Sequence, residues 1–308
     1  MFQPRPFRIA SSLVVPLVVV ALAAGCGSSS GSSSTQSTPS SSAGAFGVTK
    51  DAAIAAMVPS AIAAKGSITV ASDASYAPME YVAANGSTVV GADVDLGHAL
   101  GAVMGVKFNF ENVTFDAIIP GLASGKYGLG ISSFTDTLAR QKVVDFVTYF
   151  VAGTSFYVKA SGGPAIGSLA DLCGRSVAVE NGTTEQSDAQ AQSKKCTAAG
   201  KPAVLLHAYP TQNDANLALS SGKADVGMAD SPVAAYIVQQ SNGQFKLSGS
   251  AYGTAPYGMA VPKNSGMTEP ILAAMKKLIA DGVYTKILDK WGIQSGALTN
   301  PGINQATS

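Results

Sequence analysis

The chain has 308 residues, of which 46% are hydrophobic and 13% are charged, and its formal net charge at pH 7 is +1. This length suits about two domains of ordinary size. A nearly neutral chain lacks the concentrated basic surface of nucleic-acid-binding proteins, so we expect no nucleic acid as a partner. Two histidines and three cysteines leave little material for a zinc site or a Ser-His-Asp triad, so we expect neither a metal nor another cofactor.

Residues 1–25 have the pattern of a signal peptide rather than of folded structure. Arg5 and Arg8 give the segment a positive start, and its apolar run, residues 9–23, is shorter than the about 20 residues that span a bilayer. Small residues before Cys26 resemble a bacterial lipobox, in which the cysteine thiol is lipidated. The alternative is an ordinary secretory signal with an incidental cysteine. We expect lipidation of Cys26 and therefore an extracytoplasmic protein anchored in the cell membrane.

Residues 26–45 are predicted to be a disordered tether. Ten serines occupy the 16 positions from 27 to 42, with no charge and no apolar residue. Such a segment cannot bury enough apolar surface to offset its chain entropy. A short helical extension, residues 46–65, is expected between the tether and the main fold.

The cysteine count agrees with export. If Cys26 carries lipid, Cys173 and Cys196 remain, which is an even number in an oxidising compartment. A disulfide between them would stabilise the fold by about 3 kcal/mol in the chain-entropy model. The alternative is two buried thiols. We expect the disulfide.

Strand and helix patterns alternate from about residue 67 onward. Alternation of this kind implies an α/β fold with parallel sheets and helices on both faces. Asp93 is interpreted as a helix N-cap, Pro120 is tolerable in its helix if it falls within the first turn, and Ser231 is interpreted as an N-cap that precedes Pro232. The helix patterns cover residues 93–104, 115–124, 168–172, 184–194, 211–220, 231–238, 271–279 and 284–291. The strand patterns cover residues 67–71, 106–110, 129–131, 176–179, 203–206 and 225–228.

Two apolar segments, residues 150–158 and 252–261, are predicted to be extended strands that cross between two lobes. With such crossings, one lobe is formed by a continuous segment of the chain, and the other lobe is formed by the segments before and after it. We therefore expect a first lobe from residues 66–153 and 254–293, a second lobe from residues 154–253, and a C-terminal tail of residues 294–308.

Several short motifs follow one another in a recognisable order. They are VASDASYAPMEY (residues 70–81), VGADVDL (90–96), FDAIIPGL (115–122), ISSFTDTLAR (131–140), NGTTE (181–185) and ADSPVA (229–234). Together they resemble the polar-amino-acid solute-binding proteins of bacterial ABC importers, over about residues 67–293. The resemblance implies a two-lobed, periplasmic-binding-protein-like fold that closes on one free amino acid and docks onto an importer permease.

The resemblance also implies roles for individual residues. Arg140 matches the arginine that grips the ligand α-carboxylate, and Thr184 matches a loop residue that supports that carboxylate. Asp230 matches the acid that receives the α-ammonium. Ser133 and Thr135 match further partners of the ammonium, Tyr76 and Phe115 match aromatic residues that sandwich the ligand side chain, and Asp73, Ser132 and Glu180 match positions lining the side-chain pocket in some relatives.

The chemistry of these residues supports the same assignment. A zwitterion removed from water needs a cation at one end and an anion at the other. Arg140 offers planar, bidentate geometry for a carboxylate, and Asp230 ends a strand at the edge where ligands of α/β sheets lie. The alternatives are a surface arginine, a turn acid, and core aromatics for Tyr76 and Phe115.

The charges of the predicted site bear on its ligand. Asp73 and Glu180 are acidic, and Arg140 is the only arginine between Arg8 and Arg175. If Arg140 holds the α-carboxylate, no second arginine remains for a side-chain carboxylate. We therefore expect a cationic or neutral polar amino acid rather than glutamate or aspartate.

Two other functions remain open. An enzyme of the same fold, a dehydratase acting on prephenate-like acids, could use Glu80 or Glu180 as a general acid. The sequence lacks a set of nucleophile, base and orienting residue, and His98 and His207 are interpreted as structural, so we do not expect an enzyme. A binding module that signals to a membrane receptor is the other alternative. In each case a monomer is expected.

Overall fold

The computed structural model of the chain describes residues 45–307. The predicted signal peptide, the predicted lipidation site at Cys26 and nearly all of the predicted tether lie outside the described residues. The described part opens with a 3-10 turn (η1, Ala45–Gly47) and two short helices, α1 (Ala52–Met57) and α2 (Ser60–Lys65). These lie where the helical extension was expected.

Eight strands form one mixed sheet with the order β5-β1-β6-β11-β7-β10-β8-β9. β1 pairs parallel with β5 and β6, and β8 pairs parallel with β9 and β10. The two long strands β7 and β11 run antiparallel through the middle and join these two parallel groups, as predicted from their apolar segments. The strands are β1 (Ser67–Ser72), β5 (Lys107–Asn112), β6 (Leu129–Gly130), β7 (Val144–Lys159), β8 (Ser176–Glu180), β9 (Leu205–Tyr209), β10 (Val226–Asp230) and β11 (Phe245–Pro262), with a separate three-stranded sheet of β2 (Ser75–Tyr76), β3 (Glu80–Val82) and β4 (Val89–Val90).

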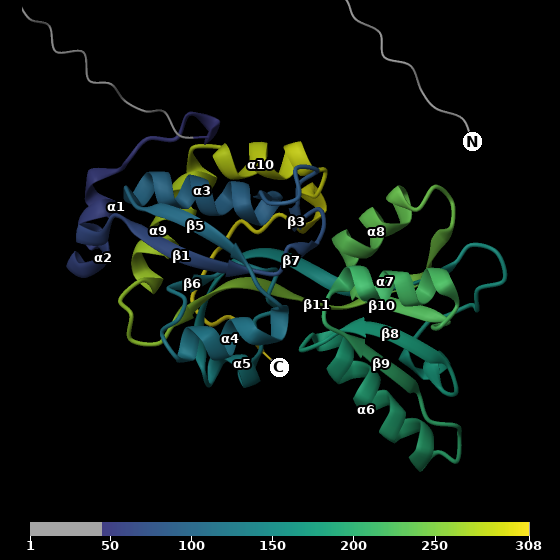
Figure 1. Ribbon diagram of the computed structural model, residues 1–308. Helices are drawn as coiled ribbons and strands as arrows, with labels where there is room; N and C mark the ends of the chain where they lie inside the picture. Colours follow the sequence, from purple (N-terminus) through teal and green to yellow (C-terminus); the bar gives the residue numbers. More distant parts are fainter. Residues whose placement is uncertain (1–44, 308) are drawn as a thin grey trace, which may run out of the picture. The chain divides into compact units, whose positions relative to one another are not determined.

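Helices cover both faces of each parallel group, as the alternating pattern predicted (Figure 1). α3 and α9 pack together over one group, where the apolar stripe with Ile271, Met275 and Leu278 is fully buried. The helices are α3 (Ala92–Met104), α4 (Phe115–Ala123), α5 (Leu138–Gln141), α6 (Thr184–Ala198), α7 (Gln212–Ser221), α8 (Ser231–Gln240), α9 (Thr268–Ala280) and α10 (Val283–Trp291), with 3-10 turns η2 (Leu169–Leu172) and η3 (Gln294–Gly296).

Two element boundaries were predicted wrongly, and Pro120 does not meet its condition. Pro120 is the sixth residue of α4, not part of its first turn, because the helix begins at Phe115, as predicted, directly after the extended Thr114. Ser231 is the first residue of α8, and Asp230 occupies the N-cap position. β9 lies at residues 205–209 rather than 203–206. Each error is a shift of an element boundary, where local propensity is a weak guide.

Asp93 is also not the N-cap that the sequence suggested. Gly91 holds that position with φ 143°, and a side chain there would overlap the carbonyl of Met79. Asp93 is instead the second residue of α3, and its Oδ2 accepts hydrogen bonds from the Ser133 amide (2.9 Å) and the Tyr149 hydroxyl (2.7 Å). It therefore acts on a loop 40 residues away rather than on its own helix.

The predicted disulfide is present. Cys173 and Cys196 are bonded, with their Cα atoms 5.6 Å apart, so the end of η2 is tied to α6. The bond lies in a small core with Val177 and Val204, which fixes the outer helix of this group against its strands. Within residues 45–307, no helix combines the length and the apolar character needed to cross a membrane.

Candidate functional site

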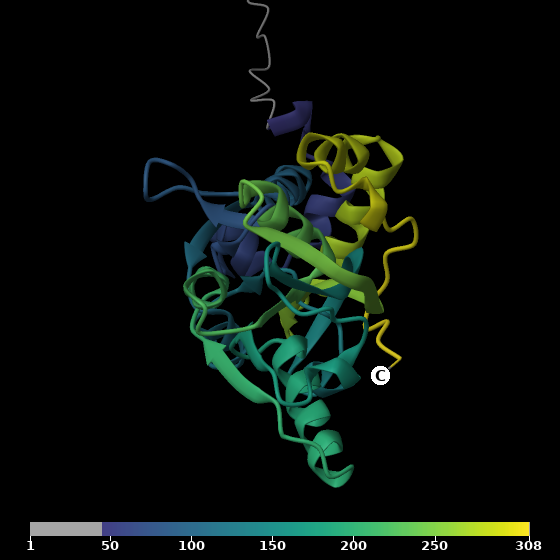
Figure 2. The ribbon, with the colours of Figure 1, turned by 90° about the vertical axis from the view of Figure 1, so that its right-hand side faces the viewer.

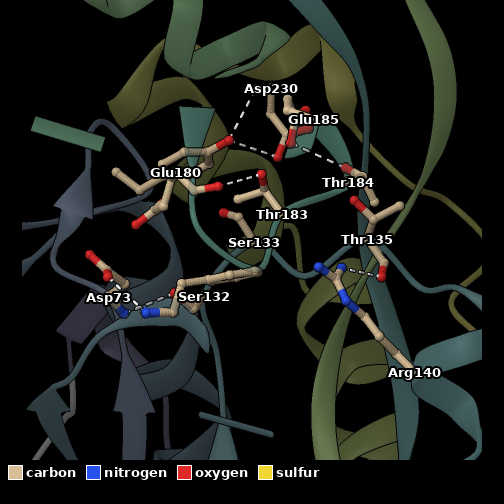
Figure 3. Close-up of a pocket in the computed structure, with 12 residues that line it drawn as sticks. Asp73, Ser132, Ser133, Thr135, Arg140, Glu180, Thr183, Thr184, Glu185 and Asp230 are labelled. Atoms are coloured by element: carbon tan, nitrogen blue, oxygen red, sulfur yellow. Dashed lines mark hydrogen bonds between the residues drawn. The ribbon is translucent and has the colours of Figure 1, made fainter. Parts of the chain in front are cut away.

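The ten residues predicted to contact a ligand all line one pocket, together with Thr183 and Glu185 (Figure 3). Several of them follow directly on strands: β1 ends before Asp73, β8 ends at Glu180 and β10 ends at Asp230. The topology thus gathers their side chains at the strand ends, where ligands of α/β sheets bind. The lining residues are Asp73, Tyr76, Phe115, Ser132, Ser133, Thr135, Arg140, Glu180, Thr183, Thr184, Glu185 and Asp230.

Arg140 lies in the short helix α5, whose N-cap Thr137 accepts a hydrogen bond from the Arg140 amide at 3.2 Å. Its guanidinium donates to two carbonyl oxygens, that of Thr135 at 2.8 Å and that of Gly182 at 3.0 Å. The guanidinium carbon lies 5.3 Å from the centre of the Phe115 ring. These contacts fix the plane of the guanidinium and point it into the pocket.

Burial lowers the pKa of Arg140, and the nearby Glu185 and Asp230 oppose that effect. Among the described residues, the guanidinium makes no ion pair. It carries five N–H donors, of which the two carbonyl groups use only part. Arg140 is therefore able to receive a planar anion such as a carboxylate.

Tyr76 and Asp230 form a pair of hydrogen bonds within the pocket. The Tyr76 hydroxyl donates to Oδ2 of Asp230 at 3.0 Å and accepts the amide of the same residue at 3.0 Å. Burial, followed by the charge of Glu185, raises the pKa of the Asp230 carboxyl well above its usual range. An ion pair with a cation would lower that pKa again, so Asp230 is suited to receive an ammonium group.

Glu185 lines the pocket but was missed by the sequence analysis. It is 2% exposed, and its carboxylate accepts hydrogen bonds from the hydroxyl groups of Thr154 (2.6 Å) and Thr184 (3.2 Å). In the sequence, Glu185 is an acidic residue near a helix N-terminus, a position that favours acids for electrostatic reasons alone. The sequence does not indicate whether its carboxylate faces solvent or the pocket.

Asp73 and Glu180 form a second acidic group in the pocket. Oδ1 of Asp73 accepts the Ser75 amide at 3.0 Å and Oδ2 accepts the Phe115 amide at 2.9 Å, so Asp73 also holds its own loop in place. Burial raises the pKa of Asp73. Burial, and then the charge of Asp73, raise the pKa of Glu180 well above its usual range.

The loop of Ser132 and Ser133 is shaped from behind by buried acids. The Ser132 hydroxyl donates to Glu80 at 2.9 Å and accepts the Asp73 amide at 2.9 Å. Ser133 has φ 51°, a left-handed conformation that is unfavourable for a residue with a side chain. Its amide is bound by Asp93, which compensates for that cost.

The balance of charge in the pocket is strongly acidic. Four carboxyl groups line it, from Asp73, Glu180, Glu185 and Asp230, against the single guanidinium of Arg140. Figure 3 shows Arg140 on the opposite side of the group from Glu180, Glu185 and Asp230. Buried like charges without counter-ions are costly, and a ligand with one anionic and two cationic groups would reduce that cost.

The chain is similar in sequence and in structure to known binding proteins. A family described as "Bacterial extracellular solute-binding proteins, family 3" matches residues 68–294. The arginine-binding protein ArgT of Corynebacterium glutamicum is 34% identical over 253 residues, covering 82% of this chain and 83% of its own. A solved ancestral arginine-binding protein with bound arginine is 38% identical, has a TM-score of 0.67 and covers 73% of this chain and 98% of its own. A second solved structure is an ancestral arginine-binding protein bound to glutamine. It is 38% identical, has a TM-score of 0.66 and covers 74% of this chain and 98% of its own.

Proposed function

We propose that this chain, which belongs to the bacterial extracellular solute-binding proteins of family 3, captures a cationic amino acid, L-arginine above all, and delivers it to an ABC importer. The observation that carries the proposal is the placement of one guanidinium and four carboxyl groups around a single pocket. The names of the similar proteins support binding rather than catalysis, so they favour capture over a dehydratase activity.

The charges of arginine complement those of the pocket. Its α-carboxylate would bind Arg140, and its α-ammonium would bind Asp230 with Glu185 beside it. Its guanidinium would then reach the carboxyl groups of Asp73 and Glu180, for which the protein supplies no cation within the pocket lining. A neutral side chain would leave that second acidic group unpaired, so glutamine should bind more weakly than arginine.

Hydrogen bonds around the pocket connect the two groups of strands and support capture by closure. The Arg140 guanidinium donates a hydrogen bond to the main-chain carbonyl of Gly182, and the main-chain amide of Gln212 donates to the Ser75 hydroxyl at 3.0 Å. The lining side chains leave a cavity of only about 10 Å³, which has room for about one water molecule. Because an amino acid is far larger, the lobes or the lining side chains must separate to admit it, and ligand contacts to both sides would then favour the closed state.

Several further features belong to the same proposal. The lobes would comprise residues 66–153 with 254–293 and residues 154–253, and the closed form would present both to a permease. Lipidation at Cys26 would keep the protein at the outer face of the membrane, as a monomer. A receptor that senses the same ligand is the alternative partner, and no observation favours it.

A thermal-shift survey of the twenty amino acids, with ornithine added, tests the proposal. A ligand at about 100 times its Kd stabilises the folded state by about 2.7 kcal/mol. We expect arginine, lysine and ornithine to raise the melting temperature most, and glutamine to raise it less. The proposal fails if aspartate or glutamate gives the largest shift, or if no amino acid gives any.

A further inference from the structure

The last residues of the chain, beyond the range that matches the family, form an ordered strap along β7. Figure 2 shows this segment as the yellow trace that leaves α10 and ends at the label C. The Thr148 amide donates to the carbonyl of Gly302 at 2.9 Å, and the Gly302 amide donates back to the Thr148 hydroxyl at 2.9 Å. The side-chain oxygen of Asn304 accepts a hydrogen bond from the Phe146 main-chain amide at 2.8 Å, and the Asn304 main-chain amide donates to the Phe146 carbonyl at 3.0 Å.

The strap ends on a buried carboxylate. The amides of Gln305 and Ala306 both donate to Oδ2 of Asp136, at 2.7 and 3.1 Å. Oδ1 of Asp136 accepts a third hydrogen bond, from the side chain of Gln141 at 2.7 Å. Asp136 is 2% exposed, so the two amides of the strap provide a large part of the solvation of its charge.

Asp136 lies in the middle of the loop that presents Arg140. The carbonyl oxygen of Thr135, which precedes Asp136, accepts a hydrogen bond from the Arg140 guanidinium. The side chain of Thr137, which follows Asp136, accepts one from the Arg140 main-chain amide and caps the helical turn that carries Arg140. On its other side the loop is held by β11, because the Asp136 amide donates to the carbonyl of Pro256 at 2.9 Å. The loop is thus clamped between β11 and the strap.

We propose that the C-terminal strap, residues 297–306, is a positioning element of the ligand site, which holds Arg140 in its binding geometry by anchoring Asp136. Among the described residues, no hydrogen bond joins the strap directly to a residue of the pocket lining, and the strap binds the loop through two main-chain amides that donate to the Asp136 carboxylate. Without it, Asp136 would lose two of its three side-chain hydrogen bonds, and the loop would lose its attachment to the strap while keeping that to β11. The proposal rests on the proposed function, because it assigns Arg140 to the ligand.

A double-mutant cycle tests the proposal. The variants are the chain without residues 303–308, the substitution Asp136→Ala, and the two combined, each measured for arginine binding by calorimetry well below its melting temperature. We expect each single change to weaken arginine binding by about tenfold, the effect of losing hydrogen bonds to a charged group. We expect the combined variant to be no weaker than either alone, because both changes break the same link.

A control and a second measurement complete the design. Asp51→Ala removes the two N-cap hydrogen bonds of α1, far from the pocket lining, and should lower the melting temperature without changing the Kd for arginine. Amide hydrogen exchange without ligand should be faster at residues 136–141 of the truncated chain, while α9 keeps its protection. The proposal is overturned if the truncated chain binds arginine within twofold of the full chain, if the two changes add, or if exchange in this loop is unchanged. Failure of the full chain to bind any cationic amino acid would refute the proposed function instead, and the exchange measurement would still decide the role of the strap.

Discussion

Replacing Arg140 with alanine removes the group that we propose binds the α-carboxylate of the ligand. In the structure Arg140 is half-buried, its guanidinium is bonded among the described residues to two carbonyl oxygens, and it lies over the ring of Phe115. Removing one partner of a buried, hydrogen-bonded charge pair costs about 3–5 kcal/mol, because the other charge remains unpaired. At about 1.4 kcal/mol for each factor of ten, Arg140→Ala should weaken arginine binding by about 100- to 5000-fold.

The substitution also removes the hydrogen bond between Arg140 and Gly182, which connects the two sides of the pocket. That loss affects any ligand, so a second ligand is needed to isolate the carboxylate. Agmatine is arginine without its α-carboxylate, and we expect the substitution to change its affinity by less than about threefold. Calorimetric titration of both ligands into both proteins gives the four affinities. Equal losses for arginine and agmatine would show that the α-carboxylate does not bind Arg140.

Three further predictions concern the acids and the disulfide. Glu180→Gln should weaken arginine binding by about tenfold or more while leaving glutamine within about threefold, as measured by competition between the two amino acids; equal effects would place the guanidinium elsewhere. Burial and neighbouring carboxyl groups raise the pKa of Asp230 and of Glu180, so these groups hold protons that a cationic ligand must displace. Arginine affinity should therefore rise as pH increases from about 4, and the released protons should appear as heats that depend on the buffer. The ligand-free protein should lose stability over the same range, because its folded state binds more protons than its unfolded state. An affinity that is constant between about pH 4 and 8 would contradict this coupling. The double substitution Cys173→Ser with Cys196→Ser should lower the free energy of unfolding by about 3 kcal/mol in urea titrations, and no loss would show that the disulfide is dispensable.

The pocket could be predicted largely from the sequence because its residues follow directly on strands. Asp73, Glu180 and Asp230 each stand at or just after a strand end, and the parallel topology carries such positions to one edge of the sheet. The helical turn that carries Arg140 could be predicted because Thr137 is a typical N-cap residue. The order of elements predicts where these residues gather, whereas their selection as ligand contacts came from the resemblance of the motifs to a known family.

The features that were missed depend instead on how elements face one another. Glu185 near the start of α6 has the same local pattern whether it faces solvent or the pocket. Asp93 looks like a cap, and only the packing of α3 against the loop of Ser133 shows that it holds that loop. The strap acts on Asp136 through main-chain amides, which every residue except proline carries, so no side-chain pattern could reveal it.

The accumulation of buried acids itself points to the ligand's charge. Besides burial, the charge of Glu185 raises the pKa of Asp230, and the charge of Asp73 raises the pKa of Glu180. Where these acids ionise, their repulsion lowers the stability of the ligand-free protein, and among the described residues none of the four forms an ion pair. A ligand with two cationic groups converts this cost into binding free energy, since its ion pairs relieve the repulsion within each pair of acids. The same pocket should reject acidic amino acids, because their second carboxylate would add a like charge that no group in the lining neutralises.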